Sequence, residues 1–152
     1  MNPLESVKSL LEKEYYDVAL EKFSYEENAL EQLRVSLVFQ DHPHIPDLML
    51  FLMFIPNIEK ELDGVSVLQY YIGFDQISER TEEQLVHLKD VIVKINQSLP
   101  LGHFGIIESE QILYLKYCQT YLGALNDTSS KQIVEAINAL SFELSSNYDN
   151  FF

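Results

Sequence analysis

The sequence predicts an α+β domain in which three helices pack on an antiparallel sheet of five to six strands. Apolar side chains recur at helical spacing in three segments, and a capping motif opens each of them. Between these segments lie stretches that alternate apolar and polar side chains, or are apolar throughout, as strands are. The turns between them are short, which favours antiparallel pairing. The expected order is α-β-β-β-β-α-β-β-α, in a single domain over residues 1–152.

The first helix is predicted to begin after Asn2 and to end near Glu14. Asn2 is a suitable N-cap, Pro3 suits the first helical position, and Glu5 completes a capping box. One face of this helix carries an apolar stripe formed by Leu4, Val7, Leu10 and Leu11.

Two strands are expected to follow this helix. From Tyr16 to Glu21 larger apolar side chains alternate with polar or small ones, which indicates a strand, and the polar segment Ser24–Asn28 indicates a turn. The second strand begins at Leu33, and its inward side chains are predicted to be Leu33, Val35, Leu37 and Phe39.

A loop and two further strands come next. The segment Asp41–Asp47 contains two prolines and is predicted to be a loop. The segment Leu48–Ile55 is apolar at every position, which favours a central strand covered on both faces. A turn at 63–64 leads to the strand Val67–Phe74, which is rich in aromatic and β-branched residues.

The second helix is the clearest in the sequence. Thr81 and Gln84 form a capping box, and Pro100 stops the helix. Its apolar stripe comprises Leu85, Leu88, Ile92, Ile95 and Leu99.

Two strands and a third helix complete the chain. The strands His103–Ile107 and Gln111–Tyr121 are joined by a short polar turn. Ser129 and Gln132 are expected to form the capping box of the last helix, and the polar tail after Asn147 is expected to be frayed. The core stripe of this helix is predicted to be Ile133, Ile137, Leu140 and Leu144.

The composition limits the kinds of partner. The formal net charge is −14, from 24 acidic and 10 basic residues. Because nucleic acids and anionic membranes are bound through Lys and Arg, this charge argues against both. Cys118 is the only cysteine, so no intrachain disulfide can form, and the N-terminal segment lacks the features of a signal peptide. No apolar run is long enough to span a bilayer. We expect a cytoplasmic protein.

One loop carries residue types that bind metals. Asp41, His42, His44 and Asp47 lie close together in the sequence, and imidazole and carboxylate are zinc ligands. Their spacing matches no recognised ligand pattern, so a solvated turn is the preferred interpretation. A small metal-dependent enzyme built on this loop is the alternative.

Other catalytic and cofactor sites are not indicated. The sequence contains neither a G-x-S-x-G nucleophile motif nor a phosphate-binding glycine motif. Cys118 falls in the middle of a strand and is expected to be a small core residue. We therefore predict no catalytic residue, no metal and no cofactor. A small-ligand sensor with an apolar pocket under the sheet is a further alternative, which the many Phe and Tyr residues allow.

Some apolar side chains lie outside the core stripes and are candidates for a protein interface. At about 100° per residue, Val86 and Val93 point well away from the stripe of their helix. Phe142 likewise points away from the stripe of the last helix. Such residues are typical of interfaces, although single exposed apolar residues are also normal.

The second half of the chain resembles the YbjN-type domain, a family that shares its fold with the chaperones of type III secretion. The resemblance is carried by the helix end Asn96–Gly102 and by the strand segments Phe104–Ile107 and Ile112–Tyr117. The element order and the closing helix agree with it in outline. The fully apolar segment Leu48–Ile55 is a departure, because neither family's pattern demands it.

The resemblance implies an antiparallel sheet packed by helices, frequent dimerisation and a non-enzymatic role. Secretion chaperones of this fold are small, acidic, cytosolic dimers that hold extended segments of secreted proteins, and YbjN-type proteins are described as bacterial regulators. Since the middle helix of those chaperones helps to build the dimer, the resemblance assigns that role to Val86, Asp90 and Val93. We expect a homodimer that acts by binding another protein.

Overall fold

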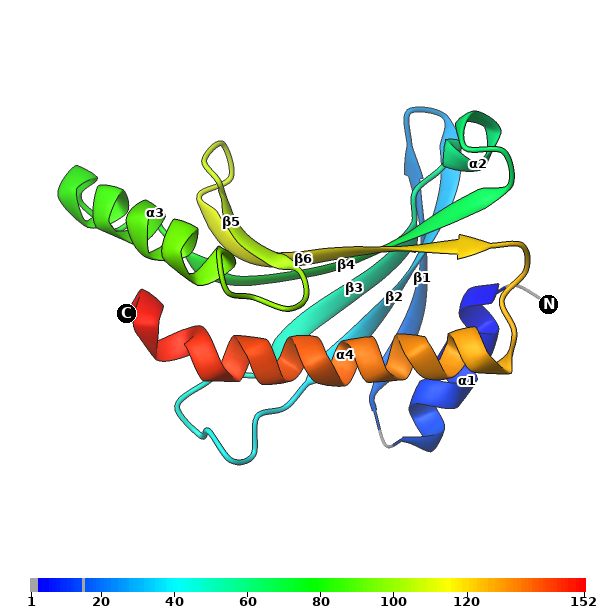
Figure 1. Cartoon of the computed structure of the whole chain (residues 1–152), viewed down its shortest axis with the longest axis horizontal. Coiled ribbons are helices and arrows are strands. Elements are labelled where there is room, and N and C mark those ends of the chain that lie inside the picture. The colour runs from blue at the N-terminus through cyan, green and yellow to red at the C-terminus, as the bar shows by residue number, and fades with distance from the viewer. Residues whose placement is uncertain (1–2, 15) are drawn as a thin grey trace.

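The computed structural model describes residues 3–14 and 16–152 (Figure 1). Within these residues the predicted order of helices and strands is confirmed, and a single-turn helix and a final 3₁₀ turn are added. The elements are α1 (Pro3–Lys13), β1 (Val18–Tyr25), β2 (Asn28–Leu37), β3 (Leu48–Phe54), α2 (Ile58–Glu61), β4 (Val65–Gln76), α3 (Glu82–Asn96), β5 (His103–Ile107), β6 (Ile112–Leu122), α4 (Asp127–Asn147) and η1 (Tyr148–Phe151). Asn2, the expected N-cap of α1, lies outside the described residues.

The strands of the described chain form one antiparallel sheet of six strands in the order β1-β2-β3-β4-β6-β5. Strands β1 to β4 follow one another, and each pairs with the next. After β4 the chain continues through α3 and returns as the edge strand β5, so that β6 lies between β4 and β5. The α+β class with an antiparallel sheet is therefore confirmed.

The turn between β1 and β2 is tighter than the polar segment Ser24–Asn28 indicated. Tyr25 pairs with Asn28, so that Glu26 and Glu27 alone form the turn. Their φ angles are +47° and +67°, as in the two-residue turns that match the twist of a hairpin. The two positions of such a turn usually hold Asn, Asp or Gly. Because Glu occupies both here, the sequence does not show where β1 ends and β2 begins.

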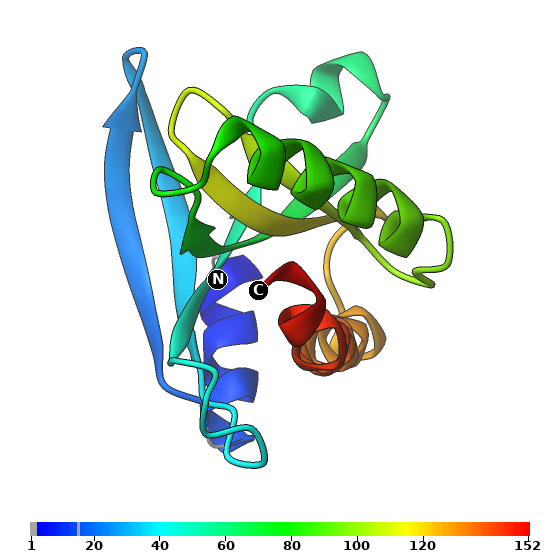
Figure 2. The ribbon, with the colours of Figure 1, turned by 90° about the vertical axis from the view of Figure 1, so that its left-hand side faces the viewer.

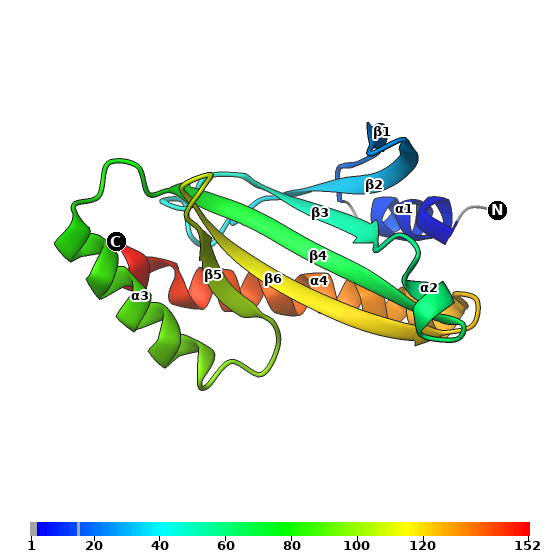
Figure 3. The same cartoon turned by 90° about the horizontal axis from the view of Figure 1, so that it is seen from above.

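Helices α1 and α4 lie on the same face of the sheet, which curves around them (Figure 2). Helix α3 packs against the edge strand β5 (Figure 3). The inner face of the sheet is apolar across its width, because Val35, Leu50, Ile72, Leu115 and Phe104 lie opposite one another on five strands and are all buried. None of the described helices is long and apolar enough to cross a membrane.

Helix α3 is fixed at both ends by hydrogen bonds. The predicted capping box is present, with Thr81 N donating to Gln84 Oε1 at 2.9 Å and Gln84 N donating to Thr81 Oγ1 at 3.2 Å. At the other end Asn96 bonds to both backbone groups of Phe104 in β5. The helix therefore has a defined position at the edge of the sheet.

Helix α4 begins earlier than predicted, and the expected capping box of Ser129 and Gln132 is wrong. The N-cap is Asn126, whose Oδ1 accepts a hydrogen bond from Ser129 N at 3.0 Å. Ser129 Oγ accepts in return from Asn126 N at 2.7 Å, so that Ser129 closes the box as the third helical residue. The predicted core stripe of this helix is buried.

The segment after Asn147 is not frayed, and that prediction is also wrong. It forms η1, in which Phe151 is buried against Phe74 and Phe104, with ring centroids 5.7 and 4.9 Å apart. Arg80 Nη1 donates to Phe151 O at 2.9 Å. Burial of an aromatic ring outweighs the polar composition of a short segment, and so the segment is held in place.

Candidate functional site

The face of the sheet turned away from α1 and α4 is the main candidate site, and we call it the outer face. Its central row consists of Arg34, Phe51, Tyr71, Lys116 and His103, which pair in register across five strands. Antiparallel sheets usually place polar side chains on a face that meets water. Here the middle of the row is aromatic, and apolar side chains flank it at Met49, Met53 and Tyr114.

Strand β3 lies inside the sheet as predicted, but the expectation that both of its faces are covered is wrong. Its inward side chains belong to the core, whereas Met49 is 39% exposed and Phe51 and Met53 are half-buried. In the described part of the chain, these three residues do not belong to the core that the helices cover. Helices α1 and α4 cover only the inner face of the sheet (Figure 2). The apolar side chains of β3 on the outer face can therefore contact another molecule.

Two tyrosines form the most ordered part of the outer face. The rings of Tyr71 and Tyr114 are stacked, with centroids 5.6 Å apart and an interplanar angle of 25°. The Tyr114 ring lies over Gly105 of the neighbouring strand, where any side chain would collide with it. Burial raises the pKa of Tyr71, and the nearby Glu110 adds to this effect. The pair therefore presents a fixed aromatic surface.

A cavity of about 600 Å³ opens on this face. Its volume is in the range of small-molecule pockets, about 300–1,000 Å³. Met49, Phe51, Tyr71 and Ile112 supply its apolar lining, and Asp47 is among its polar groups. These residues provide apolar contact and hydrogen-bond acceptors, which suit an apolar side chain of a partner or a small apolar ligand.

The sequence signal for this surface was present but was interpreted as burial. A strand that packs on one core needs an apolar side chain only at every second position. In β3 the positions between them are apolar as well, and their residues Met49, Phe51 and Met53 lie on the outer face. Cys118 illustrates the same ambiguity, because it was expected in the core and is exposed on the outer face, next to the paired residue Gln69.

The four interface residues predicted from the sequence are exposed, but they do not form one surface. Val86 and Val93 are 68% and 56% exposed on the outward side of α3. Asp90 lies between them and is paired with Lys94 at 3.0 Å. Phe142 is 71% exposed but lies on α4, beside a different and smaller cavity.

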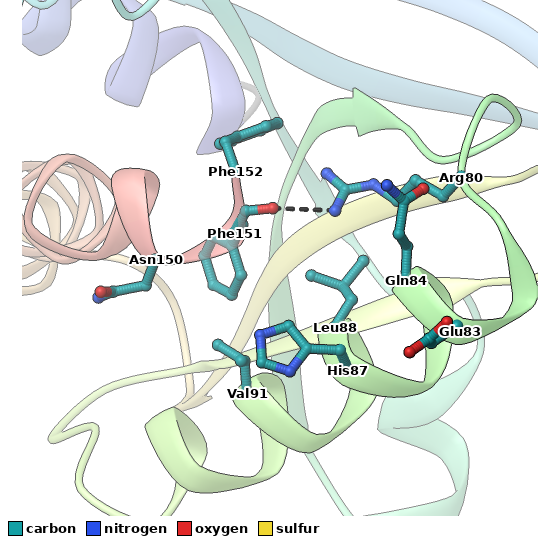
Figure 4. A pocket seen from close by; sticks show the side chains of 9 residues that line it. All are labelled: Arg80, Glu83, Gln84, His87, Leu88, Val91, Asn150, Phe151 and Phe152. Carbon is teal, nitrogen blue, oxygen red and sulfur yellow. Dashed lines mark hydrogen bonds between the residues drawn. The ribbon is translucent and has the colours of Figure 1, made fainter.

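A further cavity of about 670 Å³ lies between α3 and η1 (Figure 4). Arg80 contacts the residues from η1 and the C-terminus that form one wall of this cavity. Its guanidinium pairs with Asp75 at 2.9 Å and donates a hydrogen bond to Phe151 O. The same guanidinium lies 5.3 Å from the centroid of the Phe152 ring. His87 belongs to the opposite wall (Figure 4). The described lining residues include no Ser, Cys or Lys beside this His, and Glu83 is the acidic residue among them.

The loop Asp41–Asp47 is tied to the end of the chain. His44 Nε2 lies 2.8 Å from Asp149 Oδ1, and its ring contacts Tyr148 edge-on. The rings of His42 and His44 meet edge to face, with centroids 6.1 Å apart. Over residues 3–14 and 16–152, no group of three or more His, Cys, Asp or Glu side chains is arranged to hold a metal ion.

No protein-family model matches this chain, and no curated protein matches it. The resemblance to the YbjN-type family therefore stays a prediction.

Proposed function

We propose that this chain is a non-enzymatic, protein-binding domain that docks its partner on the outer face of the sheet. The observation that carries the proposal is the group of apolar side chains on a face that the helices leave uncovered, formed by Met49, Phe51, Met53, Tyr71 and Tyr114. Fully burying a Met or Phe side chain contributes about 1.5–3 kcal/mol, and these residues still have exposed area to bury. Aromatic residues and Met are also enriched in protein interfaces.

The charge of the domain favours a basic partner. The net charge of −14 attracts a basic protein over long range and raises its rate of association. The contact itself is apolar at the centre of the outer face, with Lys116 and His103 at one side of the row. Charge thus selects and steers the partner, and the apolar centre supplies the affinity.

We also propose that the chain forms a homodimer through the outward side of α3, where Val86, Asp90 and Val93 lie. The support is the exposure of both valines and the dimer that the resemblance to secretion chaperones implies. A cytoplasmic location belongs to the same proposal, supported by an exposed thiol at Cys118.

Three charge substitutions separate these surfaces. Met49→Glu alters the outer face at a position that water already reaches, and Val93→Glu alters α3. Thr120→Glu is the matched control, because it adds the same charge on an exposed position of β6 outside the aromatic cluster. Circular dichroism checks that each variant is folded.

The measurements are light scattering and capture of partners from the source cells, identified by mass spectrometry. We expect Met49→Glu to lose a partner that the wild type and Thr120→Glu both retain, and Val93→Glu to become monomeric. Capture of the same proteins by all three variants would refute docking on the outer face. A monomeric wild type at tens of micromolar concentration would refute the dimer.

A further inference from the structure

Part of strand β6 is an open edge of the sheet. β5 pairs only with Ile112–Lys116, whereas β6 continues to Leu122 and pairs with β4 over its whole length. On the side of β5, residues 117–122 therefore face no strand of the described chain (Figure 3). Apart from the ladders, no backbone group among residues 3–14 and 16–152 bonds to the backbone of this segment. An unpaired strand edge is a template for pairing with another chain.

This edge lacks the protection that the other edges of the sheet have. The edge strand β1 carries Glu21 and Lys22 near its centre, both in ion pairs, and charged side chains discourage strand pairing. Helix α3 packs against β5, and Asn96 bonds to the β5 backbone. Residues 117–122, in contrast, contain no charged residue and no proline. Leu122 is 83% exposed, so the open segment also has apolar area to bury.

Two glycines set the limits of the open edge. Gly102 precedes β5, and the Lys116 carbonyl oxygen faces it, since a Cβ atom on Gly102 would lie 2.9 Å from that oxygen. Because backbone groups alternate in direction along a strand, those of every second residue from 118 to 122 face the open edge. At the other limit Gly123, with a φ angle of +75°, turns the chain away from the strand. The free backbone groups are therefore centred on Thr120.

We propose that this edge pairs with the same edge of a second copy of the chain, antiparallel and about a two-fold axis that passes through the sheet at Thr120. An antiparallel ladder is identical for its two strands, so a segment that is free on both sides of its centre complements its own copy. Two copies that each carry a net charge of −14 repel each other, but the paired segments themselves carry no charge. This contact rests neither on docking at the outer face nor on the α3 dimer.

The size of the contact sets the conditions for its measurement. In the proposed register Leu122 of each chain lies opposite Cys118 of the other, and both side chains are exposed in the single chain. A ladder of about five residues per chain buries little area, so the interface belongs to the weak class. We therefore expect the contact at about 0.5 mM protein, well above the tens of micromolar at which the α3 dimer is tested.

Disulfide formation tests the register. Side chains directly opposite each other on antiparallel strands have Cβ atoms about 4.5–5.5 Å apart, close to the reach of a disulfide. In a Cys118→Ser background, Thr120→Cys should therefore cross-link to its own copy under mild oxidation. The wild type is the control, because its Cys118 is exposed but would lie about 13 Å from Cys118 of the second copy. Absence of the Thr120→Cys cross-link, or an equal rate in the wild type, would overturn the proposal.

Charges at Thr120 test the two-fold axis, with light scattering at about 0.5 mM as the measurement. All variants also carry Val93→Glu, so that α3 does not contribute, and circular dichroism checks their folding. Thr120→Glu and Thr120→Lys should each lower the association constant about two- to fivefold, because like charges then lie opposite each other. An equimolar mixture of the two should restore association, since it places opposite charges together.

The control for the added charge is Gln40→Glu. Gln40 is exposed and lies outside the strands, so this variant should associate as strongly as the chain with Val93→Glu alone. A mixture of Thr120→Glu and Thr120→Lys that associates no better than either variant alone would contradict the two-fold contact. The result does not depend on the proposed function, because the capture of partners by Met49→Glu is measured separately and at lower concentration.

Discussion

The bonds between Asn96 and Phe104 allow a quantitative test of how α3 is held at the sheet. Asn96 Nδ2 donates to Phe104 O and Asn96 Oδ1 accepts from Phe104 N, both at 2.8 Å. Phe104 lies in β5, which is an edge strand among the described strands of the sheet, so its outer backbone groups face no strand of the described chain. The Asn96 side chain therefore takes the place of a strand at this point of the edge. In Asn96→Ala both backbone groups lose their partner.

The expected loss follows from two hydrogen bonds. Each contributes about 0.5–1.5 kcal/mol net, so Asn96→Ala should lower the free energy of unfolding by about 2 kcal/mol. For a chain of 152 residues this corresponds to a fall in Tm of about 4–8 °C. The assay is urea unfolding followed by circular dichroism, with an unchanged m-value. Gln97→Ala, at the exposed next position, should change the stability by no more than about 0.5 kcal/mol.

The substitution Asn96→Asp tests the direction of the bonds. The new carboxylate can still accept from Phe104 N but repels Phe104 O, so its pKa in the folded state is raised. The variant should then be most stable at low pH, where the protonated carboxyl can donate to Phe104 O, and should lose stability as pH rises through the folded-state pKa. If Asn96→Ala is as stable as Gln97→Ala, or if Asn96→Asp gains stability relative to the wild type as pH rises, the Asn96 bonds do not hold α3.

Three further predictions concern the two cavities beside α3 and the outer face. Gly105→Ala should displace the Tyr114 ring, because the added methyl would collide with it, and tyrosine ring resonances in NMR spectra should report the lost stacking. Arg80→Met should lower the free energy of unfolding by about 1–3 kcal/mol and speed hydrogen exchange over residues 148–151; unchanged exchange there would contradict its role. Burial raises the pKa of the Glu143 carboxyl above its usual 4.5. The ionised carboxyl therefore lowers the stability of the folded wild type at neutral pH. This loss of stability disappears as the pH falls through the raised pKa and the carboxyl becomes protonated. The stability of the wild type relative to Glu143→Gln should therefore rise as pH falls, and a constant difference in urea unfolding would refute this.

The fold could be predicted because local signals and the global pattern agree. The Thr81 capping box and the Leu88 and Ile92 stripe define α3, and both are present in the structure. The strand His103–Ile107 was predicted to the residue, since its apolar side chains lie between a proline and a polar turn. Where a segment has one apolar face and a marked end, its structure follows from the sequence.

The candidate sites depend on contacts between segments that are distant in the sequence. Glu143 on α4 shares a buried helical face with Ala136 and Leu140, and an acidic residue within an apolar stripe indicates a buried carboxyl. Residues 98–100 line the same cavity as Glu143 although they are far from it in the sequence, and the sequence does not place them there. Phe151 is a comparable case, because its pocket is formed by rings from β4 and β5.

An apolar outer face has a competing explanation that needs no partner. Phe and Tyr are good strand formers, so strand propensity alone would explain Phe51 and Tyr71. Met is not among the favoured strand residues, and both Met49 and Met53 lie on this face of β3. Methionine side chains adapt to different neighbours and are common at binding surfaces. Strand propensity therefore does not account for Met49 and Met53, whereas the proposed contact with a partner would.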